Sequence, residues 1–338
     1  MRQLITGLAL LVAVAACTPA GGESPSAAPA TVTVTVTASP GAPESTPVSA
    51  PPSGGTVRPT PKPADKPTAF GPRQVVAPDG RTCPDHPTPA CTGAPPGLKL
   101  QKMPLNDGNA YRVTVPGSTL DGVYVPGDLV IPVSDVVIKN SVIDGTIFAY
   151  KDNVQQPYTI MDSTVGPAEG CNSLPGVGEG HYTAARVYIR NHGDGFRDSG
   201  DDIVIMDSFV DLCSNPGDHS DGIQGYGAGR NLFFDHNTID QRGVADRTAP
   251  IFFPAKQSPK AANITITNNL VIGGTYSIQL REIAGSLIAR NNMMVDKTWD
   301  YLPVDADCGK ADWKDNQIVE IDQAYRITKT VGPLQCTG

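Results

Sequence analysis

The sequence predicts an all-β fold in which short strands stack in successive coils, as in a parallel β-helix. A unit of the form apolar-x-apolar-x-[Asn/Asp/His]-[Ser/Asn/His] recurs along the chain, and a recurring phrase indicates a stacked-coil architecture. The alternating apolar residues of each unit suit a strand with one inward face. Glycine (35) and proline (32) are abundant, and few helix-capping patterns compete. A β-sandwich would instead space its strands evenly between hairpin turns.

The second apolar residue of each unit serves as a marker. The markers are Ile138, Ile160, Ile189, Ile205, Phe234, Ile266 and Ala289. Two positions after the markers stand Asn140, Asp162, Asn191, Asp207, His236, Asn268 and Asn291. Short amide and carboxylate side chains stabilise tight bends by bonding to the backbone. We therefore expect these polar residues to form a column at a stacked corner.

Two further short strands are expected in each coil. A middle strand follows the corner at Val142-Ile143, Thr164-Val165, Phe209-Val210, Thr238-Ile239, Leu270-Val271 and Met293-Met294. A third strand precedes the later markers at Gly195-Phe196-Arg197, Gly222-Ile223-Gln224, Pro250-Ile251-Phe252 and Ser277-Ile278-Gln279.

The chain before the coils is predicted to be a targeting signal and a tether. Residues 1–16 carry Arg2 and a short apolar run that ends in small residues, the pattern of an export signal. Cys17 follows directly and resembles the lipidated cysteine of a bacterial lipobox, which implies an anchor on the outer face of the cytoplasmic membrane. Residues 17–74 are rich in Pro, Ala, Ser and Thr, so we expect a disordered tether.

Residues 75–338 are expected to form the folded domain, with an N-terminal cap at 75–130 and a C-terminal cap at 310–338. Six cysteines remain after Cys17, and an even number in an exported chain implies disulfides. We expect neighbours to pair: Cys83 with Cys91, Cys171 with Cys213, and Cys308 with Cys336. The net charge of −8 argues against nucleic acid as a partner. We expect a monomer.

The signal, tether and coils together resemble the right-handed parallel β-helix repeat proteins of the pectate-lyase-like superfamily, in a bacterial lipoprotein form. The likeness covers about residues 100–310. It implies a single-stranded right-handed parallel β-helix with capped ends. The superfamily includes polysaccharide lyases, epimerases, hydrolases and non-catalytic surface proteins, so the resemblance is more specific for fold than for function.

A repeated phrase suggests where a site could lie. His192-Gly-Asp194-Gly and His219-Ser-Asp221-Gly each precede a third strand, so stacking would bring the two aspartates about 4.8 Å apart. The markers Ile189 and Ile205 are only 16 residues apart, which predicts a pinched coil beside a groove. Asp194, Asp218 and Asp221 are candidate Ca²⁺ ligands, since clustered carboxylates suit that ion.

These residues lead to three functional hypotheses. The first is a lyase or epimerase for a uronic-acid glycan, in which a cation neutralises the substrate carboxylate and His192, His219 or Arg197 removes a proton. The second is a hydrolase that uses Asp194 and Asp221, or Asp201 and Asp202, as paired carboxylates. The third is a non-catalytic protein that binds or displays glycan. The candidate substrate-binding residues are Gln224, Gln279, Arg281, Lys256 and Tyr226.

Overall fold

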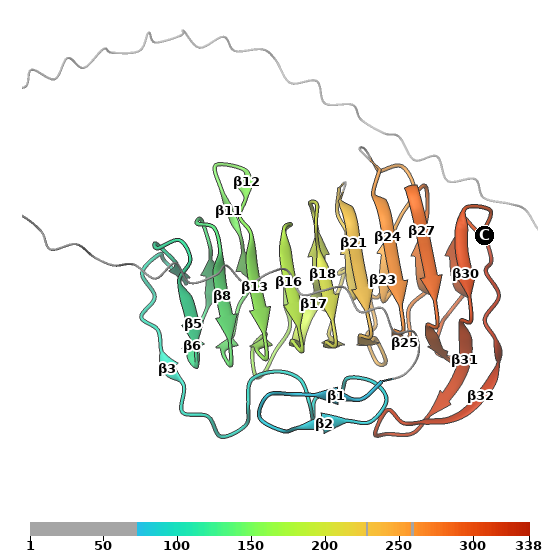
Figure 1. Cartoon of the computed structure of the whole chain (residues 1–338), viewed down its shortest axis with the longest axis horizontal. Helices are drawn as coiled ribbons and strands as arrows, with labels where there is room; N and C mark the ends of the chain where they lie inside the picture. Colours follow the sequence, from blue (N-terminus) through green and yellow to red (C-terminus); the bar gives the residue numbers. More distant parts are fainter. Residues whose placement is uncertain (1–72, 228, 258–259) are drawn as a thin grey trace, which may run out of the picture. The chain divides into compact units, whose positions relative to one another are not determined.

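Short strands follow one another along the chain and stack in parallel on their counterparts one turn away (Figure 1). The computed structural model describes residues 73–227, 229–257 and 260–338. These residues form strands and turns without a helix, so the predicted all-β class is confirmed. No helix in this part of the chain is long and apolar enough to cross a membrane. The predicted signal 1–16, Cys17 and nearly all of the predicted tether lie outside the described residues.

One coil consists of three strands and the corners that join them. β18 (Val204–Met206), β19 (Phe209–Leu212) and β20 (Ile223–Gly225) make one such coil. In the next coil β21 (Arg230–Asp235), β22 (Thr238–Asp240) and β23 (Ile251–Phe253) pair in parallel with those three strands in the same order. This regular pairing builds three flat faces and is compatible with the predicted β-helix.

The remaining strands extend the three faces. The first face also contains β5 (Thr119–Asp121), β8 (Val136–Lys139), β13 (Tyr158–Met161), β16 (Tyr182–Ala185), β24 (Ala262–Thr267), β27 (Ala284–Arg290) and β30 (Ala311–Lys314). The second face also contains β3 (Gln101–Lys102), β6 (Val123–Val125), β9 (Val142–Ile143), β14 (Thr164–Val165), β25 (Leu270–Ile272), β28 (Met293–Val295) and β31 (Gln317–Ile321). The third face also contains β4 (Ala110–Arg112), β7 (Asp128–Val130), β10 (Ile147–Phe148), β15 (Asn172–Val177), β26 (Tyr276–Leu280) and β29 (Leu302–Ala306).

The interior of the stack is filled by one continuous apolar core. Each strand contributes its inward residues, so that Ile205 packs over Phe234 and Val210 over Ile239 in register. Stacking is favourable because it removes apolar surface from water at about 25 cal/mol per Å². Some aromatic side chains lie over one another, as Tyr158 and Tyr182 do with ring centroids 5.5 Å apart.

The corner between the first and second faces has a left-handed backbone. Asn140, Asp162, Asp207, His236, Asn268 and Asn291 all have φ between 46° and 60°, which confirms their predicted place in a corner column. Asx residues tolerate this conformation better than most. We call these six residues, together with Arg186 and Asp315, which share the conformation, the corner column.

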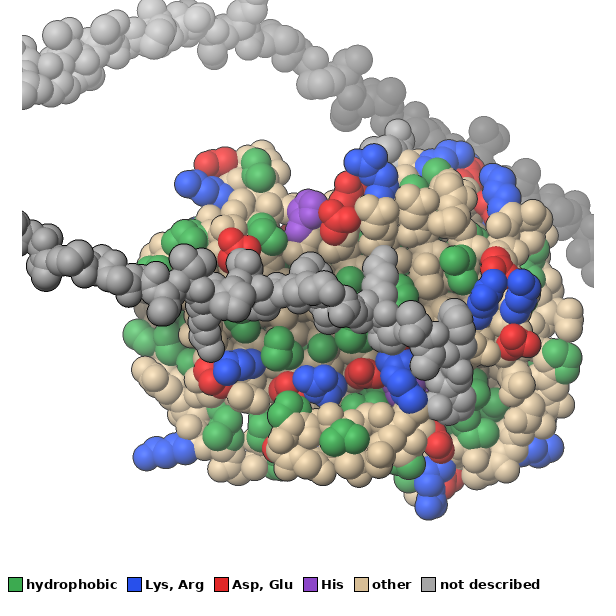
Figure 2. Space-filling model, viewed as in Figure 1, with side chains coloured by type: hydrophobic (Ala, Val, Ile, Leu, Met, Phe, Trp, Pro, Cys, Tyr) green, Lys and Arg blue, Asp and Glu red, His purple; other side chains and the backbone are tan. Residues whose placement is uncertain are grey.

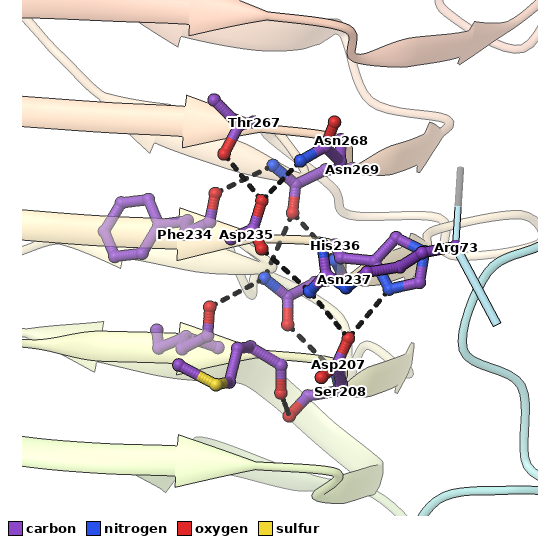
Figure 3. A network of polar contacts seen from close by, with 12 residues as sticks. Arg73, Asp207, Ser208, Phe234, Asp235, His236, Asn237, Thr267, Asn268 and Asn269 are labelled. Atoms are coloured by element: carbon purple, nitrogen blue, oxygen red, sulfur yellow. Dashed lines mark hydrogen bonds and ion pairs between the residues drawn. The ribbon is translucent and has the colours of Figure 1, made fainter. Parts of the chain in front are cut away.

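A buried ladder of amides runs beside the corner column. Asn237, Asn269, Asn292 and Asn316 lie on successive coils and each is at most 3 % exposed. In each adjacent pair, the amide oxygen of the later asparagine accepts hydrogen bonds from the backbone N–H and the side-chain amide of the earlier one (Figure 3 shows the pair Asn237 and Asn269). The ladder therefore satisfies backbone groups that the bend removes from the sheets.

The predicted pinched coil is wrong. Ala184, not Ile189, lies between Ile160 and Ile205 in the first face, so these markers are 24 and 21 residues apart rather than 29 and 16. Asn191 is accordingly not in the corner column, where Arg186 stands instead. The segment around Ile189 mimics the repeat unit because second-face strands also alternate apolar residues, here in the long strand β17 (Tyr188–Asp198).

Strand β17 continues from the second face into the third. Tyr188 and Ile189 pair with β14 and β19 on the second face. The end of the strand, around Phe196, pairs with β15 and β20 on the third face. This coil therefore has no separate corner between its second and third strands.

All three predicted disulfides are present: Cys83–Cys91, Cys171–Cys213 and Cys308–Cys336. The last lies near an antiparallel hairpin of β31 and β32 (Ile327–Pro333) at the C-terminal end of the stack.

Near the start of the described residues, β1 (Val75–Val76) and β2 (Thr82–Cys83) pair with each other. Rather than covering the N-terminal end of the stack, this segment runs along the corner column as far as Asp207 and Asp235.

Candidate functional site

The outer surface of the third face carries a row of polar and aromatic side chains. Arg197, Gln224, Phe252, Gln279 and Asp305 occupy equivalent outward positions on five successive coils. Each follows an inward apolar residue by one position, as strand alternation requires. The third strands predicted around Phe196, Ile223 and Ile278 are thus confirmed, and their stacking aligns Arg197 with Gln224 and Gln279. We call these five residues the third-face row.

Arg197 is held by a ring of contacts that joins two coils. Its Nη2 donates to Asp194 Oδ2 at 3.1 Å and its Nε donates to Gln224 Oε1 at 3.1 Å. Gln224 in turn donates to Asp221 Oδ2 at 2.9 Å. The guanidinium also lies 4.6 Å from the ring centroid of Tyr226, which is 63 % exposed. Arg197, Gln224, Tyr226, Asp194 and Asp221 form what we call the Arg197 cluster.

Asp194 and Asp221 are neighbours on adjacent coils, as predicted, but they face the protein rather than solvent. Asp194 is 5 % exposed and Asp221 is fully buried. Asp194 Oδ1 accepts the backbone N–H of Asp221 at 3.0 Å, and Asp221 Oδ1 accepts that of Ala249 at 3.0 Å. Each carboxyl thus accepts a backbone N–H from the coil that follows it. At these corners that N–H has no partner within a sheet, so the carboxyl takes the place of a strand neighbour.

Packing also accounts for the glycines of the repeated phrase. A Cβ built on Gly195 would lie 2.4 Å from the Gly222 carbonyl oxygen, and one on Gly222 would lie 2.3 Å from that of Pro250. Backbone atoms cannot give way at such distances. The Asp-Gly pair therefore recurs because one residue caps the next coil and the other allows the backbones to approach.

Burial sets the protonation behaviour of both carboxyls. Desolvation raises the pKa of Asp194, and the nearby Arg197 guanidinium opposes that rise. Desolvation raises the pKa of Asp221 well above its usual range, and the Asp194 carboxyl adds to the effect. Two carboxyls in one low-dielectric site disfavour simultaneous ionisation.

The two histidines of the repeated phrase lie in different environments. His192 is fully buried, and its Nδ1 lies 2.8 Å from the Leu174 carbonyl oxygen, so Nδ1 is the protonated nitrogen. Burial lowers the pKa of His192. His219 lies on the exposed loop before Ser220. Neither ring touches the Arg197 cluster through a hydrogen bond or ion pair among the described residues.

The three predicted calcium ligands do not fit that ion. Asp218 Oδ2 accepts bonds from the Ser173 hydroxyl and the Asn215 backbone N–H, while one oxygen each of Asp194 and Asp221 is occupied by a backbone amide. Among the described residues there is no group of three or more His, Cys, Asp or Glu side chains able to hold a metal. Ca²⁺ needs six to eight oxygen ligands, and these occupied carboxyls do not offer such a set.

The other predicted binding residues lie on the third and fourth coils of the row. Gln279 Nε2 donates to Asp305 Oδ2 at 2.7 Å, and Arg281 forms an ion pair with the same carboxylate. Arg281 also lines a cleft of about 490 Å³ together with Lys260 and Lys310. Lys256 is exposed on the loop that follows β23.

Sequence reasoning missed Phe252 on the row and Asp198 inside the stack. Phe252 directly follows the inward Ile251, and that alternation could have placed it outside. Asp198 stands two positions after the inward Phe196, so the same rule could have placed it inside. It is fully buried, and the Tyr182 hydroxyl donates to its Oδ1 at 3.2 Å.

We expect Asp198→Asn to stabilise the protein increasingly as pH rises. Burial raises the pKa of Asp198 well above its ordinary value of 3.8. Folding therefore favours the protonated carboxyl, and the wild-type free energy of unfolding falls as pH rises from 3.8 through the folded-state pKa. Asparagine does not ionise, so the variant should gain about 1–3 kcal/mol over the wild type at high pH.

Chemical denaturation between pH 4 and pH 9 measures this difference. Asp152→Asn, on an exposed turn, is the matched control and should follow the wild-type profile. Parallel profiles for wild type and Asp198→Asn would contradict the expected protonation of the buried carboxyl.

The first face and its corner differ from the third-face row because they carry many paired charges. In Figure 2 basic and acidic side chains alternate in a band across the molecule. Ion pairs along the corner include Lys139–Asp121, Arg186–Asp162 and Arg73–Asp207. The opposite charges of each pair neutralise one another.

Comparison of this chain with protein-family models, with curated proteins and with solved structures finds no match.

Proposed function

We propose that this protein is an exported, lipid-anchored protein that binds an acidic polysaccharide along the third-face row. In this proposal the stacked coils are a single-stranded right-handed parallel β-helix similar to those of the pectate-lyase-like superfamily. Cys17 carries the lipid on the outer face of a bacterial cytoplasmic membrane, and residues 17–74 act as the tether. The folded domain is a monomer with no nucleic-acid partner.

The single observation that carries the proposal is the exposed stack of Tyr226 and Arg197. An exposed aromatic ring suits the apolar face of a sugar, and a guanidinium suits a carboxylate. Gln224 and Gln279 add amide groups on the same line of the surface, one coil and three coils from Arg197. The repeat of about 4.8 Å between coils lets an extended chain of sugars meet these groups in succession.

Buried carboxyls fit a supporting role in this proposal. Asp194 and Asp221 orient Arg197 directly and through Gln224, and their burial keeps most of their charge away from an anionic ligand. A bound cation is then unnecessary for neutralising the carboxyls around Arg197. This differs from the calcium-dependent reaction that the sequence led us to expect.

We expect Tyr226→Ala and Arg197→Ala each to weaken binding of a uronate oligosaccharide by about tenfold. Loss of one aromatic or cationic contact of this kind costs roughly 1–1.5 kcal/mol, which is about a factor of ten. Isothermal titration calorimetry with oligogalacturonate and oligoguluronate measures the effect. Tyr124→Ala, which removes a part-exposed tyrosine of β6 on the second face, is the control and should leave affinity unchanged. Equal affinity in all variants would contradict the proposed surface.

A lyase or epimerase acting on the same glycan is the second candidate. Of the three predicted proton acceptors, Arg197 alone is both on the row and part-exposed, with 23 % of its side chain accessible. Absorbance from unsaturated products, lost in Arg197→Ala, would establish a lyase. Reducing ends without that absorbance would instead favour the hydrolase hypothesis, in which Asp194 and Asp221 or Asp201 and Asp202 serve as acid and base. Asp201 is already paired with Arg230 at 3.0 Å, which gives that version less support.

A further inference from the structure

The N-terminal segment of the described chain, residues 73–94, is fastened to the corner column at several points. Arg73 Nη2 lies 2.8 Å from Asp207 Oδ1 and 2.7 Å from Asp235 Oδ2. Further along, the Gly93 N–H donates to the Arg186 carbonyl oxygen at 2.9 Å. We call residues 73–94 the clasp. Figure 3 shows Arg73 reaching the column beside His236.

Two stacked imidazoles join the clasp to the column. The rings of His86 and His236 have centroids 5.2 Å apart and planes inclined by 28°. His236 is fixed at both nitrogens, with Nδ1 2.8 Å from Asp207 Oδ1 and Nε2 2.7 Å from the Asp85 carbonyl oxygen. His86 is only 2 % exposed, and neither of its ring nitrogens has a hydrogen-bond partner among the described residues.

The surroundings of His86 oppose a positive charge. Burial is the main cause that lowers the pKa of His86 to about 3, and the nearby His236 and Arg73 add to it. An approach to the Asn268 backbone offsets only part of this effect. The carboxylates of Asp207 and Asp235 are already engaged by Arg73, so an imidazolium at His86 would be a further cation without a partner of its own.

The clasp and the coils have separate apolar cores. Its apolar residues Val75, Cys83 and Cys91 form a small cluster of their own, separate from the main core. The Cys83–Cys91 disulfide keeps that cluster closed on itself. A unit with its own core can open locally at lower free energy than global unfolding.

We propose that the clasp is a pH-operated device, in which protonation of His86 releases residues 73–94 from the corner column while the stacked coils stay folded. The groups that face His86 are His236 and Asn268 from the column and Arg73 from the clasp, with Asp207 and Asp235 behind Arg73. Release frees a segment that spans at most roughly 3.5 Å per residue. It therefore lengthens the connection between the coils and the chain that precedes them.

The direction of the pH effect follows from the difference between the two pKa values of His86. Because the pKa of His86 is lower in the docked state than its ordinary value of 6.5, docking is fully stabilised above pH 6.5. That stabilisation is lost as pH falls toward the docked-state value of about 3. One coupled proton changes the undocking equilibrium constant by about tenfold per pH unit across this window.

Amide hydrogen exchange of the full chain tests the proposal, using the Gly93 N–H as the reporter of the clasp. After correction for the intrinsic exchange rate, its opening constant should rise about tenfold per pH unit between pH 6 and pH 4. The Phe233 N–H, bonded to the Ile203 carbonyl oxygen inside the stack, should stay protected. His86→Phe keeps a flat ring against His236 but cannot take a proton, so its Gly93 profile should lose this slope.

The wild type and His86→Phe share every other ionisable group, so the difference between the two profiles isolates His86. His219→Phe, at an exposed position, is the control and should keep the wild-type slope. The histidine ring signals of the wild type, followed by NMR, give a second measurement that does not depend on the variant folding. A His86 ring that titrates near 6.5, an equal slope in His86→Phe, or simultaneous opening at Phe233 would each overturn the proposal.

Discussion

Asn269→Ala is expected to lower the free energy of unfolding by about 4 kcal/mol. The Asn269 side chain accepts the backbone N–H of Asn237 at 2.9 Å and donates to the Phe234 carbonyl oxygen at 3.1 Å. It also bonds the neighbouring amides of Asn237 and Asn292. All these groups are buried, so alanine would leave several donors and acceptors without water, each at about 1–3 kcal/mol.

Thermal unfolding followed by circular dichroism measures this effect, which should appear as a decrease of about 10 °C in the midpoint. Asn109→Ala is the matched control, because Asn109 is exposed and its side chain makes no hydrogen bond in the described part of the chain. It should shift the midpoint by no more than about 2 °C. A similar small change in both variants would show that water or local rearrangement replaces the amide ladder.

Asp221→Ala is expected to cost about 3 kcal/mol of stability. The substitution removes the acceptor of the buried Ala249 N–H and the acceptor of the Gln224 amide. It also frees Gln224, which positions Arg197, so the affinity for a glycan should decrease as well. Asp300→Ala removes an exposed partner of Arg247 and should cost less than about 1 kcal/mol.

Denaturant unfolding and glycan titration of the same sample separate a structural role of Asp221 from a catalytic one. A capping carboxyl predicts lower stability together with weaker binding. A catalytic carboxyl predicts an unchanged unfolding midpoint and the loss of product formation. The second result would support a catalytic role for Asp194 and Asp221.

Local patterns in the chain were sufficient for the stacked architecture. The alternation around Ile205, Phe234 and Ile266 places apolar side chains inside, and the corner positions favour Asx residues because the backbone there is left-handed. These properties depend on a few neighbouring residues. The same applies to the disulfides, since each joins cysteines that are neighbours among the six, and the Cys171–Cys213 loop spans only two coils.

Local patterns were insufficient where two segments offered similar signals. Val187-Tyr188-Ile189 has the composition of a first-face unit but lies on the second face, because Tyr182–Ala185 has already taken the first-face position. The pairing energy with the neighbouring coils decides between such registers. This energy cannot be read from the residues of the unit alone. The prediction of a short coil between Ile189 and Ile205 failed for this reason.

By itself, the sequence determined the class of fold, six of the eight corner-column residues, the disulfides and the third strands that carry Arg197, Gln224 and Gln279. Only the tertiary structure decided which polar groups reach solvent, because burial depends on segments that are far apart in the chain. Asp221 and His192 look like reactive groups in the sequence, yet they bond backbone atoms of neighbouring coils. Arg73 reaches Asp207 across 134 positions, and His86 is buried although no signal in the local sequence indicates it.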